Sequence, residues 1–301
     1  MVTVDCHLHL TEVPEHVPAW WMDELYRPYG GEWGDTDGRW MVDLLDRSGI
    51  DIGMVQGADI RQTTWHPDHP DEYENYVPND YTAEQVALFP DRLKGVAHVD
   101  PMRGVPWALE ELERCVKELD FRALKLVCSY QHFSPADRRV DPIYEKCLEL
   151  DIPVHIFTGW TPIIEAMLEY ADPMLLNDVG ARFRDLKVIV VVNWPWVDMA
   201  IGMVAKHPNF YADMSQLAEG TPENLYAALA AFRSYSAIDR VMYGSDNSDK
   251  TRIGGRGEGT VPDLYRQVNT VAIARGEEPF TDEELAAIMG GTAADVYKIE
   301  N

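Results

Sequence analysis

Positive charge is scarce in this sequence. Lys and Arg number 26 against 51 Asp and Glu, which gives a formal net charge of −25 at pH 7. Nucleic acids and anionic membrane surfaces repel so acidic a chain, so the composition argues against both classes of partner. If the substrate is itself an anion, the positive charge that receives it must be local, from a metal ion, a lysine or an arginine.

Cysteines and long apolar runs are scarce as well. The four cysteines are scattered and form no C-x-x-C pair, so they predict reduced core residues in a cytoplasmic protein. They are Cys6, Cys115, Cys128 and Cys147. No run of about 18 uncharged apolar residues exists, which predicts that no segment spans a membrane. The first residues lack the basic stretch of a secretory signal, and we expect none.

Eight short apolar runs recur along the chain. They span residues 2–8, 50–56, 93–99, 122–128, 152–158, 186–192, 209–213 and 239–245. Several are apolar throughout, as in parallel strands buried on both faces. Helical patterns lie between them, so the sequence predicts one (β/α)8 barrel domain over residues 1–301. A doubly wound sheet is the alternative, but no glycine-rich nucleotide-binding loop follows the first run.

The segments between the runs carry helix signals. Residues 106–119 place apolar side chains on one stripe, with glutamates opposite. Residues 141–150 and 221–232 each begin with a capping residue followed by proline, so Asp141 and Thr221 are the expected N-caps.

Two long stretches do not fit a minimal barrel. Residues 11–37 and 57–80 follow the first two predicted strands, so both should lie at the C-terminal face, where barrel active sites form. Loops of this length are usually functional, and their Trp and Tyr content favours ordered lids. His66 and His69 are expected either to reach over the mouth or to belong to an exposed polar loop.

The first run contains two histidines that are separated by one residue. Alternation along a strand would point His7 and His9 the same way, about 7 Å apart, with Val4, Cys6 and Leu8 on the other face. Two imidazoles on one face suit a divalent metal ion. The alternative is a polar strand end with two solvated histidines.

The eighth run ends at Asp246. In a closed barrel the eighth strand lies against the first, so Asp246 should stand beside His7 and His9. Two imidazoles and one carboxylate make a metal site with open positions. Asp246 could instead be the general base that takes a proton from water, or simply a turn or helix-capping residue.

Five blocks of the sequence resemble the amidohydrolase superfamily, and most closely its amidohydrolase-2, or aminocarboxymuconate-semialdehyde-decarboxylase-like, group. In order along the chain they are VDCHLHL, VPNDYTAEQVALFPDRLKGVAHVDP, DPIYEKCLELDIPVHIFTG, PWVDMAIGMVAKHPNFYADMS and DRVMYGSDNS. The resemblance implies a barrel with one metal ion or, as in some lactonases, with none. It also implies hydrolysis or hydration of small acids and lactones, or decarboxylation of aromatic and unsaturated acids.

Residue by residue, the resemblance assigns His7 and His9 as first-strand metal ligands and Asp246 as the eighth-strand aspartate. Two positions depart from the pattern, because Phe157 and Asn193 stand where the group usually has histidines. Phenylalanine cannot ligate a metal and an amide oxygen is a weak zinc ligand, so we expect weak metal affinity. The ion would be zinc or manganese, and the alternative is a site without metal.

Two buried polar residues are further catalytic candidates. His155 shares the strand parity of Phe157 and should lie about 7 Å deeper in the barrel, as a catalytic residue or a hydrogen-bonded core histidine. Lys125 could anchor a substrate carboxylate, or it could be a buried lysine paired with an acid such as Asp100.

The remaining candidates are expected to bind substrate. They are His98, Trp160, Asn193, Trp194 and Trp196. The three tryptophans follow strands five and six and should rim the pocket, where their rings suit a flat or apolar substrate. Packing in the core, or between helices and barrel, is the alternative for each.

The sequence therefore predicts a small-molecule hydrolase that activates water at the corner formed by His7, His9 and Asp246. A lactone, an amide or a related carboxylic acid is the expected substrate. One alternative is a metal-dependent decarboxylase or hydratase of an aromatic or unsaturated acid. Another is a non-catalytic barrel that binds a ligand and has lost its metal ligands. A homodimer is one expectation, since members of this group often pair.

Overall fold

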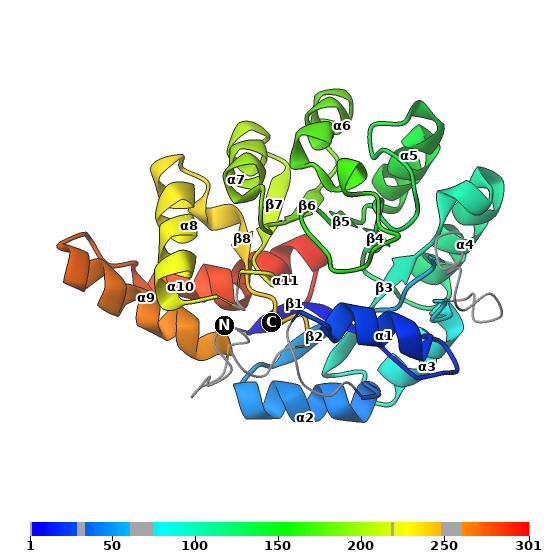
Figure 1. Ribbon diagram of the computed structural model, residues 1–301, viewed down its shortest axis with the longest axis horizontal. Coiled ribbons are helices and arrows are strands. Elements are labelled where there is room, and N and C mark those ends of the chain that lie inside the picture. The colour runs from blue at the N-terminus through cyan, green and yellow to red at the C-terminus, as the bar shows by residue number, and fades with distance from the viewer. Residues whose placement is uncertain (1, 29–33, 61–74, 218–219, 248–260, 301) are drawn as a thin grey trace.

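A computed structural model describes residues 2–28, 34–60, 75–217, 220–247 and 261–300. Eight parallel strands follow one another around a barrel in chain order (Figure 1). They are β1 (Val4–His9), β2 (Ile52–Gln56), β3 (Leu93–His98), β4 (Leu124–Leu126), β5 (Val154–Ile156), β6 (Val188–Val191), β7 (Phe210–Asp213) and β8 (Val241–Met242). This confirms the predicted (β/α)8 barrel.

Backbone hydrogen bonds bring the last strand segment against the first. The amide of Cys6 donates to the carbonyl of Tyr243 over 3.1 Å, and the amide of Asp246 donates to the carbonyl of His7 over 3.0 Å. The predicted neighbourhood of Asp246 and the first-strand histidines is therefore present.

Helices surround the barrel and connect the strands (Figure 1). They are α1 (Ala19–Tyr26), α2 (Gly38–Ser48), α3 (Asn79–Ala87), α4 (Val105–Lys117), α5 (Asp141–Leu150), α6 (Leu176–Arg182), α7 (Val197–Lys206), α8 (Pro222–Ser234), α9 (Val261–Arg275), α10 (Asp282–Ala286) and α11 (Thr292–Tyr297). Thr221 caps α8 as predicted, since its side chain accepts from the amide of Asn224. Asp141 does not cap α5: it is already the first helical residue, and its carboxylate pairs with Arg182.

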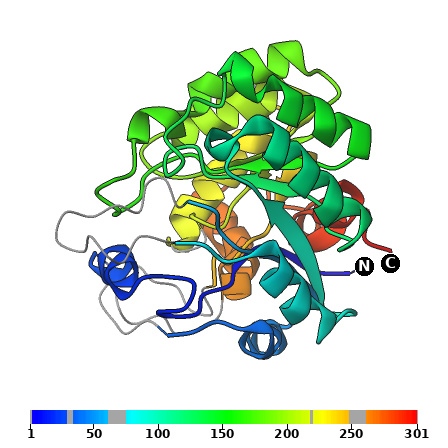
Figure 2. The ribbon, with the colours of Figure 1, turned by 90° about the vertical axis from the view of Figure 1, so that its right-hand side faces the viewer.

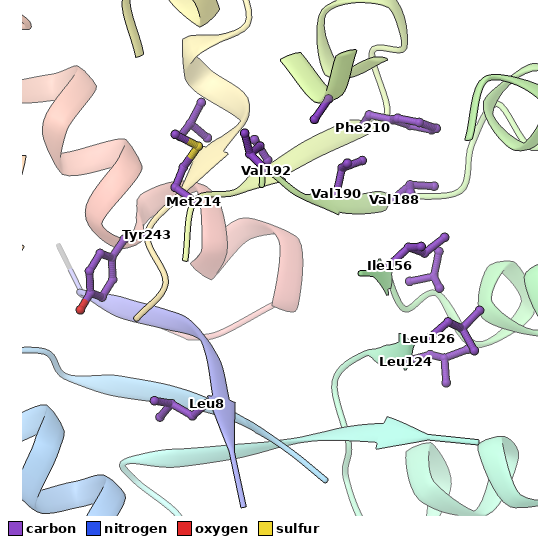
Figure 3. Close-up of a cluster of buried hydrophobic side chains, with 14 of the residues drawn as sticks. Leu8, Leu124, Leu126, Ile156, Val188, Val190, Val192, Phe210, Met214 and Tyr243 are labelled. Carbon is purple, nitrogen blue, oxygen red and sulfur yellow. The ribbon is translucent and has the colours of Figure 1, made fainter. Parts of the chain in front are cut away.

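The core has two apolar layers. Outward-pointing strand residues pack against the helices, and Figure 3 shows a cluster of such side chains that includes Leu126, Ile156 and Val190. A second cluster fills the lower barrel, where Val4 and Met242 meet Tyr297 of α11. Helix α11 thus closes one end, while α1 lies at the other (Figure 2).

Strand β1 departs from simple alternation. Its pairing with β2 shifts by one residue between Asp5 and Leu8, which marks a bulge. As a result Val4 and Cys6 belong to the interior cluster, on the same side as His7, whereas Leu8 packs outside. The predicted opposite placement of Val4 and Cys6 is therefore wrong, because alternation assumes a regular strand.

All four cysteines are buried and form no disulfides, in agreement with the predicted reduced core thiols. None of the helices in the described ranges combines the length and the apolar character that crossing a bilayer requires.

Candidate active site

A cavity of about 160 Å³ opens at the C-terminal ends of the strands. Its polar corner is formed by His7, His9 and Lys125 from β1 and β4, together with Asp246 after β8. This is the end of the barrel at which the predicted site was expected. The volume suits a small molecule.

The orientation of His7 is set by the carboxylate of Asp213. His7 is 1% exposed, and its Nδ1 lies 2.5 Å from Asp213 Oδ2 and 2.9 Å from Ser215 Oγ. The neighbouring histidines hold the pKa of Asp213 well below its usual range, so this carboxylate is an acceptor. The Nδ1 proton of His7 points to it, and the Nε2 lone pair is left facing the pocket.

Asp213 also holds His155. His155 Nε2 donates to Asp213 Oδ2 over 2.8 Å, and the amide of Ser215 donates to Oδ1 over 2.8 Å. Burial lowers the pKa of His155 to about 3, so the ring is neutral. His7, His155 and Asp213 could hold a metal, but neither His155 nor Asp213 is among the described residues that line the cavity. We therefore interpret this inner group as the support of His7.

The outer group consists of His7, His9 and Asp246. The two Nε2 atoms lie 2.9 Å apart, and Asp246 Oδ1 lies 3.5 Å from that of His7 and 3.4 Å from that of His9. Ligand atoms that bind one zinc at about 2.1 Å stand about 3.0–3.4 Å from one another. Burial lowers the pKa of His9 to about 3, and the neighbouring His7 adds to this shift. The imidazole of His9 is therefore neutral, as a metal ligand must be. These three residues fit a divalent metal ion.

Asp246 is held by its neighbours. Gln216 Nε2 donates to Asp246 Oδ2 over 2.5 Å, which leaves Oδ1 directed at the two histidines. Both Asp246 and Asn247 have a positive φ, at 50° and 62°. The side chain of Asn247 clamps the main chain of His9, accepting from its amide over 2.8 Å and donating to its carbonyl over 2.7 Å. These bonds fix the two strand ends that form the corner.

Lys125 supplies positive charge to this corner. It is 2% exposed, and its Nζ lies 3.4 Å from His7 Nε2. Burial lowers its pKa to about 8, although Asp213 and Asp246 oppose that shift. Among the described residues that line the cavity, it is the one lysine or arginine. The alternative partner, Asp100, instead caps the turn at Met102.

An aromatic wall faces the polar corner. Phe157 stacks on Tyr130 with ring centroids 5.6 Å apart, and Trp21 of α1 meets Tyr130 edge-on at 5.3 Å. Trp160 completes the wall as the sequence predicted, and Phe157 stands there in place of a ligand. The ordered helix α1 agrees with the predicted lid. Of the second lid, the described residues 57, 58, 60 and 75 line the cavity, whereas His66 and His69 lie outside the described residues.

Four of the residues predicted to contact substrate are not among the described residues that line the cavity. His98 Nε2 hydrogen-bonds the carbonyl of Val77. Asn193 Nδ2 donates to the carbonyl of Trp160 over 2.9 Å, so its amide ties two loops together. Trp194 is 64% exposed, and Trp196 precedes α7. His155 is likewise not among the described residues that line the cavity, and its Nε2 contacts Asp213.

The sequence reasoning missed Asp213, Gln216 and Asn247. Asp213 ends the seventh strand, in NFYAD, where a carboxylate at the C-terminal end of a parallel strand is itself a signal of a site. Asn247 follows Asp246 directly, but nothing in the sequence distinguishes its clamping role from that of a turn residue. Gln216 carries no pattern that points to Asp246.

The chain matches one family model and is similar to several named enzymes. The family model described as amidohydrolase matches residues 4–299. A 2-keto-4-carboxy-3-hexenedioate hydratase from Sphingobium is 26% identical over 63% of this chain and 64% of its own length. A gamma-resorcylate decarboxylase from Polaromonas is 28% identical over 49% of this chain and 45% of its own. The chain thus spans about half to two thirds of these curated relatives.

One solved structure shows the same fold over the whole chain. It is a probable 2-pyrone-4,6-dicarboxylic acid hydrolase from Acinetobacter baumannii with citric acid bound. Its TM-score is 0.64 at 14% identity, and the match covers 99% of this chain and 100% of the other.

Proposed function

The chain belongs to the amidohydrolase family, and from that premise we propose that it is a hydrolase of small carboxylic-acid substrates. In this proposal, water is activated at the corner of His7, His9 and Asp246 and attacks a lactone or amide carbonyl. The observation that carries the proposal is the placement of Asp246. Its Oδ2 is held by Gln216 while Oδ1 lies within 3.5 Å of both histidines, beside a buried lysine.

The proposed roles follow from these contacts. A water held at Asp246 Oδ1 and His9 loses its proton to Asp246 as its oxygen bonds to the carbonyl carbon. Lys125 stabilises the negative charge that develops on the carbonyl oxygen. The ring C–O or amide C–N bond then breaks, and Asp246 returns the proton to the leaving oxygen or nitrogen. When bound at His7, His9 and Asp246, a zinc or manganese ion would polarise the carbonyl.

The decarboxylase or hydratase alternative has its own support. The stacked pair of Phe157 and Tyr130 offers a flat apolar surface that suits an aromatic or unsaturated acid. The named relatives also include a hydratase and a decarboxylase. In a decarboxylation, Asp246 would deliver a proton to the carbon that loses carbon dioxide.

Isotope labelling separates the reactions. The purified protein is incubated in H₂¹⁸O with dicarboxylated lactones, unsaturated keto acids and hydroxybenzoates, and products are analysed by mass spectrometry. Hydrolysis places ¹⁸O in a new carboxylate, hydration places it in a new hydroxyl, and decarboxylation releases carbon dioxide without solvent oxygen in the organic product. Release of carbon dioxide alone would overturn the hydrolase proposal. Equal turnover by Asp246→Asn would overturn the role of the corner.

A further inference from the structure

Two cations compete for one lone pair in the polar corner. His7 Nδ1 is committed to Asp213 at 2.5 Å, so Nε2, which also lies 2.9 Å from His9 Nε2, is the nitrogen that faces a cation in the corner. Lys125 Nζ already lies 3.4 Å from that nitrogen, within the reach of an ammonium hydrogen bond. An ammonium that donates to His7 Nε2 uses the lone pair that a metal ion needs.

We propose that the ammonium of Lys125 takes the place of the metal ion in this corner, so that the site carries a built-in cation and binds divalent metals weakly. The inference rests on the proposed function only in taking this corner as the active site. It concerns which cation the corner holds, and it can be tested without a substrate.

Charge supports the proposal. Lys125 is 2% exposed, and a buried ammonium needs compensating groups. Asp213 and Asp246 are carboxylates of the same corner, because both lie within 3.5 Å of the His7 ring whose Nε2 is 3.4 Å from Lys125 Nζ. A divalent ion placed among His7, His9 and Asp246 would share these carboxylates with the ammonium and be repelled by it at short range. Metal binding therefore requires Lys125 to withdraw from a position in which it is enclosed.

Phe157 and Asn193, on the opposite side of the cavity, do not provide further ligands for a metal ion. Phe157 contributes a ring that stacks on Tyr130, so β5 supplies no nitrogen at the mouth. The amide of Asn193 is engaged with the carbonyl of Trp160. Two imidazoles and one carboxylate thus face a resident cation. We expect the activity of the protein to persist after metals have been removed.

Isothermal titration calorimetry of chelator-treated protein with Zn²⁺ and Mn²⁺ tests the proposal directly. Lys125→Met removes the ammonium and keeps an apolar chain of similar length. We expect it to bind metal at least about 10-fold more tightly than the wild type, the size of effect that groups around a metal site typically have. Lys94→Met is the matched control, because Lys94 lies on β3 and bonds Pro90 far from the corner. It removes the same net charge and should leave the metal affinity unchanged.

A double variant sharpens the test. Phe157→His restores a nitrogen to the opposite wall, and combined with Lys125→Met it should increase metal affinity beyond either change alone. If Lys125→Met does not fold, as judged by circular dichroism, Lys125→Gln replaces it in the same titration. Activity of the chelated wild type is then compared with that of the lysine variant, which should turn over substrate only with added metal.

Several outcomes would overturn the proposal. One is metal affinity in Lys125→Met equal to that of the wild type and of Lys94→Met. Another is a wild type that retains one equivalent of metal through prolonged chelation. Metal affinity is measured without substrate. A failure of the hydrolase assay alone would therefore count against the proposed reaction, but not against the proposal that Lys125 replaces the metal ion.

Discussion

The two sides of the cavity are built on different principles. On the β1, β4 and β8 side, polar atoms lie 2.5–3.5 Å apart, and hydrogen bonds to Asp213 and Gln216 orient His7 and Asp246. On the β5 side, Phe157 and Tyr130 meet through ring stacking, with centroids 5.6 Å apart. The first arrangement depends on exact positions and charge, whereas the second depends on area and shape. Substitutions should therefore act on turnover on one side and on substrate affinity on the other.

The sharpest test of this contrast is Asp246→Asn. Asparagine preserves the shape and loses the basicity, so we expect kcat to fall by about 10²–10⁴-fold on any substrate that the wild type hydrolyses. The melting temperature should change little, because Asp246 lies at the mouth of the barrel. A folded variant with near wild-type kcat would remove Asp246 from the chemistry.

Asp213→Asn tests the support behind the corner. Asparagine has one accepting oxygen in place of two and carries no charge. It therefore cannot accept from the two histidines at one end and from the amide of Ser215 at the other, and the bond that orients His7 is weakened. Loss of such a supporting group typically costs about 10–100-fold, which we expect in kcat with KM little changed. The melting temperature should fall as well, since Asp213 is fully buried. Asp213→Glu is the companion variant, and partial recovery of kcat with it would separate orientation from loss of stability. Unchanged kcat in the folded asparagine variant would contradict the positioning role.

Phe157→Leu probes the aromatic wall. The leucine fills part of the space but cannot stack on Tyr130, and an aromatic pair is worth about 0.5–1.5 kcal/mol beyond its buried area. We expect KM to rise by about 2–10-fold while kcat stays within about twofold. Steady-state kinetics over a range of substrate concentrations distinguish the two parameters. A fall in kcat with constant KM would show that the wall takes part in the chemical step.

Trp194→Ala should have the smallest effect. This side chain is 64% exposed and does not line the cavity, although its ring meets Trp160 edge-on at 6.2 Å. Exposed substitutions usually change stability by less than about 0.5 kcal/mol, and we expect kcat/KM within about twofold of the wild type. A larger loss would restore Trp194 to the substrate-binding set that the sequence suggested.

The sequence predicts the strands and the corner of the site best, because there the local pattern and the barrel topology agree. The eight apolar runs predicted eight strands because parallel strands buried on both faces must be apolar. Barrel closure then placed Asp246 beside His7 and His9 without any knowledge of side-chain contacts. The same reasoning placed Trp160 in the wall. Trp194 is 64% exposed, because alternation along a strand says nothing about how a loop turns beyond its end. His98 is the last residue of β3 and bonds the carbonyl of Val77, a contact that alternation does not predict.

By itself, the sequence determined the barrel, the end of it that carries the site, and the residue types that meet there. The alternation of apolar runs and helical patterns can be read directly from the sequence, and few folds are compatible with it. Only the tertiary structure decided which group orients which. Asp213 is 206 residues from His7 and Lys125 is 118 residues from it, yet both contact that ring. Such contacts depend on the register and bulge of separate strands, and a one-residue shift in β1 is enough to change which side chains face the cavity.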